Sequence, residues 1–261
     1  MMNDPPRPQF VQIHINQDEI CLSAEPGINT ALVADSKIFT DWCASIDPRF
    51  QIRAIHIQSV DMFGKNVGFI KLKADVVDRT DGGFIPGIVF MRGDSVAILV
   101  VLECDAKEYA VLAVQPRVPS GLFASREVLA GMLDSGGSFA GVAAKELCEE
   151  GGDTFTLTGD DLIDLNATTV CDQPIHLSPG GSDEAMRFFA HRRHVTREEL
   201  SALQGKATGH LEEGERIKLE IVPLEDLDII PDGKTIIAAS LYRRHRRLQA
   251  LQALRASREH A

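Results

Sequence analysis

The stretch at positions 131–152, GMLDSGGSFAGVAAKELCEEGG, decides the fold and carries the chemistry of this sequence. Residues 139–150 have the composition of a helix, and two glycines follow as its stop. Glu146 lies three positions before Glu149 and four before Glu150, so a helix places the three carboxylates on or near one face. Like charges repel at this spacing, and a hard divalent cation would relieve the repulsion. The glutamates alone would favour a simple exposed acidic face.

The spacing of the whole stretch resembles the Nudix box, G-x5-E-x7-R-E-U-x-E-E-x-G-U, in which U is aliphatic. Three positions depart from that pattern: Gly137 replaces the first glutamate, Lys145 replaces the arginine and Asp153 replaces the last aliphatic residue. Lysine keeps the positive charge but lacks the planar fork of arginine. Because the three-glutamate cluster is kept, the resemblance implies a metal-dependent hydrolase of nucleoside diphosphates linked to another group.

The resemblance extends over about residues 55–247 and is closest to the nucleoside-diphosphate-sugar pyrophosphatases of Nudix, of the plant ADP-sugar type. Segments such as VQPRVPSG before the box and SPGGSDEAMRFF after it carry this likeness. It implies an α+β protein, with a Nudix α/β/α sandwich around a mixed sheet. A small β-rich domain would precede the sandwich and help to form a homodimer.

The metal ligands follow from the resemblance, position by position. Glu146, Glu149 and Glu150 match the box positions that coordinate Mg²⁺ or Mn²⁺, and Glu215 matches a further ligand in a later loop. Ala130 matches the residue whose backbone carbonyl binds the metal, and a carbonyl oxygen suits a hard ion.

The loop LEEGERI at 211–217 matches the segment that supplies the general base in related enzymes. Alignment on Ile217 assigns Glu213 to that role, and a slip of one position assigns Glu212; Glu149 is a further catalytic candidate. The chemistry needs a base that deprotonates the attacking water. A charged hairpin with its turn at Gly214 is the plain alternative.

Four residues are candidates for substrate binding by the same resemblance. Arg117 matches a basic residue that faces the substrate pyrophosphate, and a guanidinium suits phosphate oxygens. Glu127 matches a glutamate upstream of the box, Gly131 is the first glycine of the box, and Glu184 lies in the SPGGSDE loop. The alternatives are a surface arginine at Arg117 and an ordinary Pro-Gly-Gly turn before Glu184.

Composition limits the class of protein. The chain has 261 residues with 44% hydrophobic and 25% charged side chains, which is typical of a globular protein of one or two domains. The formal net charge of −11 disfavours a nucleic-acid partner. No apolar run is long enough for a bilayer, so we expect no membrane partner. Five scattered cysteines without a CxxC pair favour a reducing compartment. We therefore expect a soluble intracellular protein of the cytoplasm, with an organelle left open.

The resemblance implies the domain layout, and hydrophobic periodicity predicts the secondary structure. We expect a tail at 1–10, a β-rich dimerisation domain at 11–92 and the catalytic domain at 93–261. Apolar and alternating runs predict strands, and capping patterns predict helices. The predicted strands are 55–60, 67–77, 87–90, 95–103, 108–114, 164–170, 186–191 and 218–222. The predicted later helices are 196–204, capped by Thr196, and 235–256. The arginine cluster on the last helix is expected to be a solvated face.

The sequence therefore predicts Mg²⁺-dependent hydrolysis of a nucleoside-diphosphate sugar, an ADP-sugar or a UDP-sugar, to NMP and sugar 1-phosphate. ADP-ribose is the alternative substrate. A catalytically weak module that binds or senses nucleotide sugars is the alternative of another class, because Gly137 and Lys145 depart from the box.

Overall fold

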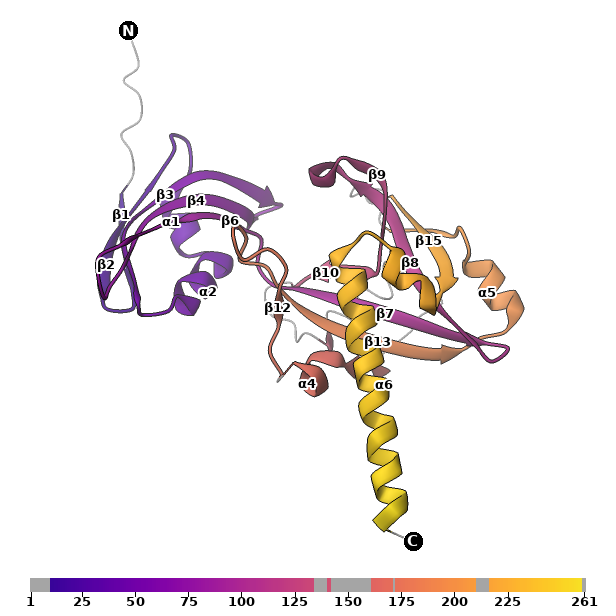
Figure 1. Ribbon diagram of the computed structural model, residues 1–261. Coiled ribbons are helices and arrows are strands. Elements are labelled where there is room, and N and C mark those ends of the chain that lie inside the picture. Colours follow the sequence, from indigo (N-terminus) through magenta and orange to yellow (C-terminus); the bar gives the residue numbers. More distant parts are fainter. Residues whose placement is uncertain (1–9, 134–139, 142–160, 171, 210–215, 260–261) are drawn as a thin grey trace. The chain divides into compact units, whose positions relative to one another are not determined.

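A computed structural model describes residues 10–133, 140–141, 161–170, 172–209 and 216–259 of the chain (Figure 1). The chain divides into two compact units. The first comprises Met1–Asp94 and Ser178–Glu184, and the second comprises Ser95–Leu177 and Ala185–Ala261.

In the first unit, two short helices accompany a sheet. Its described elements are β1 (Val11–Ile15), β2 (Asp18–Ala24), α1 (Thr30–Ala34), α2 (Lys37–Ser45), β3 (Phe50–Phe63), β4 (Asn66–Asp78), β5 (Phe84–Ile85) and β6 (Ile88–Met91). The strand order is β1-β2-β3-β4-β5, with β6 also paired to β4; β2 and β3 run parallel and the other pairs are antiparallel. This sheet confirms the prediction of a β-rich N-terminal part.

Alternating side chains build the core of the first unit. In β4, Ile70 and Leu72 are fully buried while the alternating Lys71 and Lys73 are exposed, because neighbouring residues of a strand point to opposite faces. Phe39 of α2 packs into the same cluster as Ile70 and Leu72, so one face of the sheet is closed by helices.

The second unit is built on a larger mixed sheet. Its described strands are β7 (Ser95–Cys104), β8 (Lys107–Arg117), β9 (Leu122–Glu127), β10 (Leu129–Met132), β11 (Ile163–Asp164), β12 (Ile175–His176), β13 (Ala185–His194), β14 (Ala207–Thr208) and β15 (Ile217–Pro223). Its described helices are α4 (Leu165–Thr169), α5 (Arg197–Leu203) and α6 (Gly233–Glu259), with the 3-10 turns η1 (Val118–Ser120) and η4 (Leu224–Ile229). The order is β11-β13-β7-β8-β15-β14, and β13 runs parallel to β7.

Strand β7 lies at the centre of this sheet and is buried on both faces. Ala97 and Leu99 belong to one core cluster and Ile98 and Val100 to another, as expected for a continuous apolar run between two layers. Figure 1 shows α6 crossing β7 and β13 on the first face, and α5 contributes Leu203 to the cluster on the second face. The α+β sandwich around a mixed sheet is confirmed.

Capping residues set the ends of α5. The Thr196 side chain accepts a hydrogen bond from the Glu199 amide, and the Glu199 carboxylate accepts one from the Thr196 amide, which is the reciprocal capping box. The predicted helix at 196–204 is confirmed with its cap.

The prediction of a strand over 164–170 is wrong. Only Ile163 and Asp164 form β11, and the chain then turns into α4 because the Asp164 carboxylate accepts hydrogen bonds from the amides of Asn166 and Ala167. This local capping outweighs the strand preference of the threonines and valine that follow.

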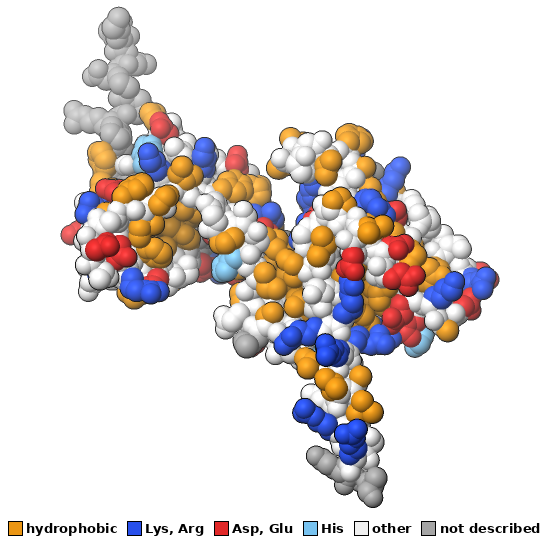
Figure 2. Space-filling model, viewed as in Figure 1, with side chains coloured by type: hydrophobic (Ala, Val, Ile, Leu, Met, Phe, Trp, Pro, Cys, Tyr) orange, Lys and Arg blue, Asp and Glu red, His pale blue; other side chains and the backbone are white. Residues whose placement is uncertain are grey.

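The last helix runs from Gly233 to Glu259, longer than the predicted 235–256. Arg244 and Arg247 are exposed on it, as expected for a solvated basic face, whereas Arg243 and Arg246 pair with Asp228 and Glu108. Figure 2 shows Lys and Arg side chains along the surface of this helix. None of the described helices, α6 included, combines the length and the apolar character needed to cross a bilayer.

Candidate functional site

Two of the predicted substrate-binding residues meet at the β8–β9 hairpin of the second unit. Arg117 ends β8 and Glu127 ends β9. The register sets Arg117 opposite Leu122 and Glu127 opposite Ala113, so the long Arg117 side chain reaches along the hairpin to Glu127. The Arg117 Nε donates to Glu127 Oε1 at 2.8 Å and the Nη2 donates to Oε2 at 3.0 Å. This two-bond fork fixes the plane of the guanidinium.

Glu127 is the buried member of the pair. Its side chain is 1% exposed, whereas that of Arg117 is 42% exposed. Burial alone would raise the pKa of the Glu127 carboxyl. The hydrogen bonds from Arg117 and the neighbouring charge of Lys234 outweigh it and hold the pKa below its ordinary value. Glu127 is therefore an ionised, buried carboxylate that holds the more exposed guanidinium of Arg117 in place.

Lys234, in the first turn of α6, is a second cation on the same carboxylate and was missed from the sequence. Its Nζ donates to Glu127 Oε2 at 2.7 Å and to Asp232 Oδ1 at 3.2 Å. The residue lies 107 positions after Glu127, and no local pattern links the two. Only the beginning of the helix has a local signal, Asp232, whose carboxylate accepts a hydrogen bond from the Thr235 amide at 2.9 Å.

Thr235 ties the same helix turn to the strand that leads to the box. The amide of Val128 donates to Thr235 Oγ1 at 3.0 Å, and that hydroxyl donates to Asp232 Oδ2 at 2.8 Å. Thr235 and Val128 are both fully buried. The beginning of α6 and the junction between β9 and β10 are thus held as one piece.

The predicted carbonyl ligand Ala130 and the predicted substrate residue Gly131 follow within four positions of Glu127, on β10. They pair with Ala97 and Val96 of the buried strand β7, and both are half-buried. Because β10 is paired to the central strand, the start of the glycine-rich stretch is held firmly against the sheet.

Glu184 belongs to the first unit, where its carboxylate lies 3.5 Å from Arg92 Nη2. The preceding Asp183 accepts a hydrogen bond from the amide of Arg92 at 2.8 Å, and burial raises the pKa of this carboxyl. The SPGGSDE loop is therefore bound to the strand end at Arg92, and Glu184 is largely buried there.

The other predicted site residues lie outside the described ranges. They are Glu146, Glu149, Glu150, Glu212, Glu213 and Glu215. Among the residues that the structure describes, no three His, Cys, Asp or Glu side chains form a group that could hold a metal ion.

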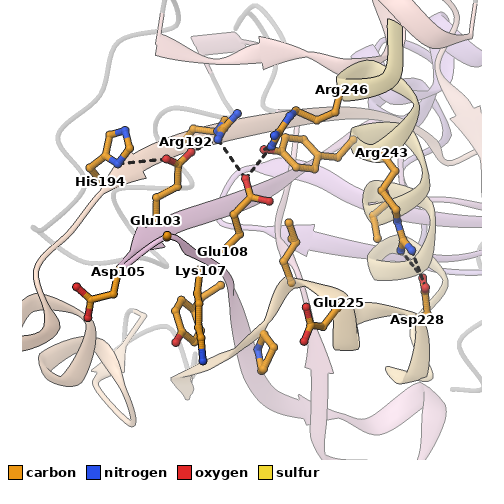
Figure 3. Close-up of a pocket in the computed structure, with 16 residues that line it drawn as sticks. Glu103, Asp105, Lys107, Glu108, Arg192, His194, Glu225, Asp228, Arg243 and Arg246 are labelled. Carbon is orange, nitrogen blue, oxygen red and sulfur yellow. Dashed lines mark hydrogen bonds and ion pairs between the residues drawn. The ribbon is translucent and has the colours of Figure 1, made fainter. Parts of the chain in front are cut away.

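A cavity of about 1020 Å³ lies at the other end of the central strands (Figure 3). It is lined by the β7–β8 hairpin around Glu103 and Glu108, whereas β10 pairs with the beginning of β7. Its three arginines are all paired with carboxylates: Arg192 with Glu103 and Glu108, Arg246 with Glu108, and Arg243 with Asp228. Five Asp and Glu side chains and four Lys and Arg side chains line this cavity, which lies at the Lys107 end of β8, whereas Arg117 lies at the other end.

Comparison with known proteins supplies the family. No protein-family model matches the chain. The chain is 40% identical over 240 residues to Nudix hydrolase 14, chloroplastic, of Arabidopsis thaliana, covering 86% of this chain and 77% of that protein. Among solved structures it is similar to an ADP compounds hydrolase, with a TM-score of 0.50 and 15% identity, over 79% of this chain and 98% of that one. The second likeness concerns the fold alone.

Proposed function

Because this chain belongs to the Nudix hydrolase family, we propose that it hydrolyses the pyrophosphate of a nucleoside-diphosphate sugar. The substrate would be an ADP-sugar or a UDP-sugar, and the products NMP and sugar 1-phosphate. The chain is a hydrolase by its family, and this proposal adds the substrate class.

The observation that carries the proposal is the Arg117–Glu127 pair beside the box. Glu127 lies three residues before Ala130, and its buried carboxylate holds a half-exposed guanidinium with two hydrogen bonds of 2.8 and 3.0 Å. A guanidinium fixed in this way can bind phosphate oxygens without first losing side-chain freedom. A pyrophosphate offers such oxygens.

The metal set is part of the proposal. Glu146, Glu149, Glu150 and Glu215, with the carbonyl of Ala130, are the oxygen donors that Mg²⁺ or Mn²⁺ prefers. Such an ion, when bound, would neutralise the pyrophosphate and activate the attacking water. It would also let a chain of formal charge −11 accept an anionic substrate.

The catalytic base is proposed on the loop 211–217. Glu213 would take the proton of the attacking water, with Glu212 as the alternative in that role and Glu149 as the further candidate. Gly131 and the largely buried Glu184 are kept as substrate-binding candidates, each near a segment that resembles the family pattern.

A homodimer is proposed for the assembled enzyme. Large apolar side chains lie exposed on each unit, including Phe84 and Ile88 in the first and Val118 and Phe123 in the second. Figure 2 shows such side chains on the surface of both units. Apolar surface of this kind often marks a protein–protein contact. The chloroplastic name of the relative is a reason to test an organelle beside the cytoplasm.

Product analysis tests the function. Purified protein with Mg²⁺ is offered ADP-glucose, UDP-glucose, GDP-mannose and ADP-ribose, with Glu150→Gln as the control. The expected result is NMP and a sugar 1-phosphate from ADP-glucose or UDP-glucose, lost in the control and on chelation of the metal. Turnover of ADP-ribose alone would favour the alternative substrate, and tight binding without turnover would favour the sensing module that Gly137 and Lys145 suggest.

A further inference from the structure

Lys234 occupies the inner side of the Glu127 carboxylate. Its side chain is 18% exposed, against 42% for Arg117, and both cations reach the same oxygen, Oε2, at 2.7 and 3.0 Å. Glu127 therefore lies between an inner cation from α6 and an outer cation from β8. Of Arg117, Glu127 and Lys234, only Arg117 has a side chain that is more than one-third exposed.

The two cations depend on each other through this carboxylate. Coulomb energies add, so the attraction between Glu127 and Arg117 is the same with or without Lys234, but the positive charge of Lys234 makes the surroundings of Arg117 less negative. Lys234 thus offsets part of the charge of Glu127 and makes the potential at Arg117 more favourable for an anion outside. It also fixes the carboxylate plane that orients the guanidinium.

We propose that Lys234 is a positioning residue for the substrate pyrophosphate, acting through Glu127 on Arg117. This inference rests on the proposed function, since it takes the pyrophosphate as the group that Arg117 binds. Loss of Lys234 makes the surroundings of Arg117 more negative by one charge and frees one oxygen of Glu127 to pull on the guanidinium. Substrate binding should suffer more than the chemical step.

The plain alternative is that Lys234 only holds α6 against β9. Thr235 offers a matched control, because it ties the same helix turn to Val128 by a hydrogen bond and carries no charge. Lys107, which is exposed in the β7–β8 hairpin, offers a control for the loss of one positive charge far along the sheet.

The experiment compares Lys234→Met, Lys234→Arg, Thr235→Val and Lys107→Met in the full chain. Turnover and equilibrium binding are measured with ADP-glucose and UDP-glucose. We expect Lys234→Met to raise KM about tenfold with kcat changed less than about threefold, and Lys234→Arg to restore most of the binding. Thr235→Val should lower Tm while KM stays near the wild-type value, and Lys107→Met should leave both unchanged.

The salt dependence of KM should be weaker in Lys234→Met, because one charge near the anion is gone.

An unchanged KM in Lys234→Met, or an equal rise in KM in Thr235→Val, would overturn the inference while the hydrolase reading stands. If the wild type binds these nucleotide sugars without turnover, and Lys234→Met weakens that binding, then the proposed function fails and the positioning role survives. A wild type that neither binds nor hydrolyses them contradicts both.

Discussion

The Glu127 cluster and the cavity of Figure 3 use the same residue types at opposite ends of one sheet, with different consequences. In each, one glutamate accepts two cations from different elements: Glu127 from Arg117 and Lys234, and Glu108 from Arg192 and Arg246. Glu127 is 1% exposed, whereas Glu108 is 32% exposed. Water can replace a lost partner at Glu108 but not at Glu127, so burial decides which ion pair the fold depends on.

The largest expected effect is that of Glu127→Gln on stability. The variant removes the buried counter-charge of Arg117 and leaves Lys234 with Asp232, and breaking a buried pair from one side costs on the order of 3 kcal/mol. The expected fall in Tm is roughly 10 °C for a unit of this size, read by calorimetry. A fall of only one or two degrees would mean that water reaches the cluster and that Glu127 behaves like the partly exposed Glu108.

The second largest expected effect is a dependence of the free energy of unfolding on pH that comes from Glu127. The pKa of Glu127 is held below its ordinary value of 4.5, so its stabilisation is fully present above about pH 4.5 and is lost as the pH falls through the folded-state pKa. Free energies of unfolding, measured with urea at several pH values between 7 and 3, should therefore show the gap between wild type and Glu127→Gln narrowing on the acid side. A gap that stays constant down to pH 3 would contradict the ionised, cation-held state of Glu127.

The smallest expected effect is that of Glu108→Gln. The pair is partly exposed, Arg192 keeps Glu103 as a partner, and surface ion pairs contribute about 0–1 kcal/mol. Tm should fall by no more than roughly 3 °C, and KM for the nucleotide sugar should not change, since this cavity lies at the far end of β7. A loss of activity equal to that of a box variant would make the cavity part of the working site.

The sequence was sufficient where one local signal governs one element. The apolar run at 95–103 predicted the central strand, and Thr196 with Glu199 predicted the cap of α5, because burial and capping are encoded by adjacent residues. The strand expected over 164–170 was wrong because the side chain of Asp164 captures the next amides and starts α4. The strand preference of a few residues is weaker than the hydrogen bonds that the side chain of the preceding residue makes to their backbone amides.

For the site, the family resemblance named some of the residues but not how they contact one another. Arg117 and Glu127 were expected near the substrate, and the hairpin does bring them together. Their partner Lys234 could not be foreseen, because it arrives from a helix 107 residues later and only the packing of α6 on the sheet makes the contact. For Glu146, Glu149 and Glu150 the reverse holds. Their spacing in the sequence indicated the family, but they lie outside the residues that the structure describes.

The most direct test of the account is mass-spectrometric identification of the products that wild type and Arg117→Gln form from ADP-glucose and UDP-glucose with Mg²⁺. The account predicts NMP and sugar 1-phosphate from the wild type. It predicts the same products from the variant, with a KM raised at least about tenfold, because the fixed guanidinium beside the box binds the pyrophosphate. Absence of these products from the wild type, or an unchanged KM in Arg117→Gln, would contradict it.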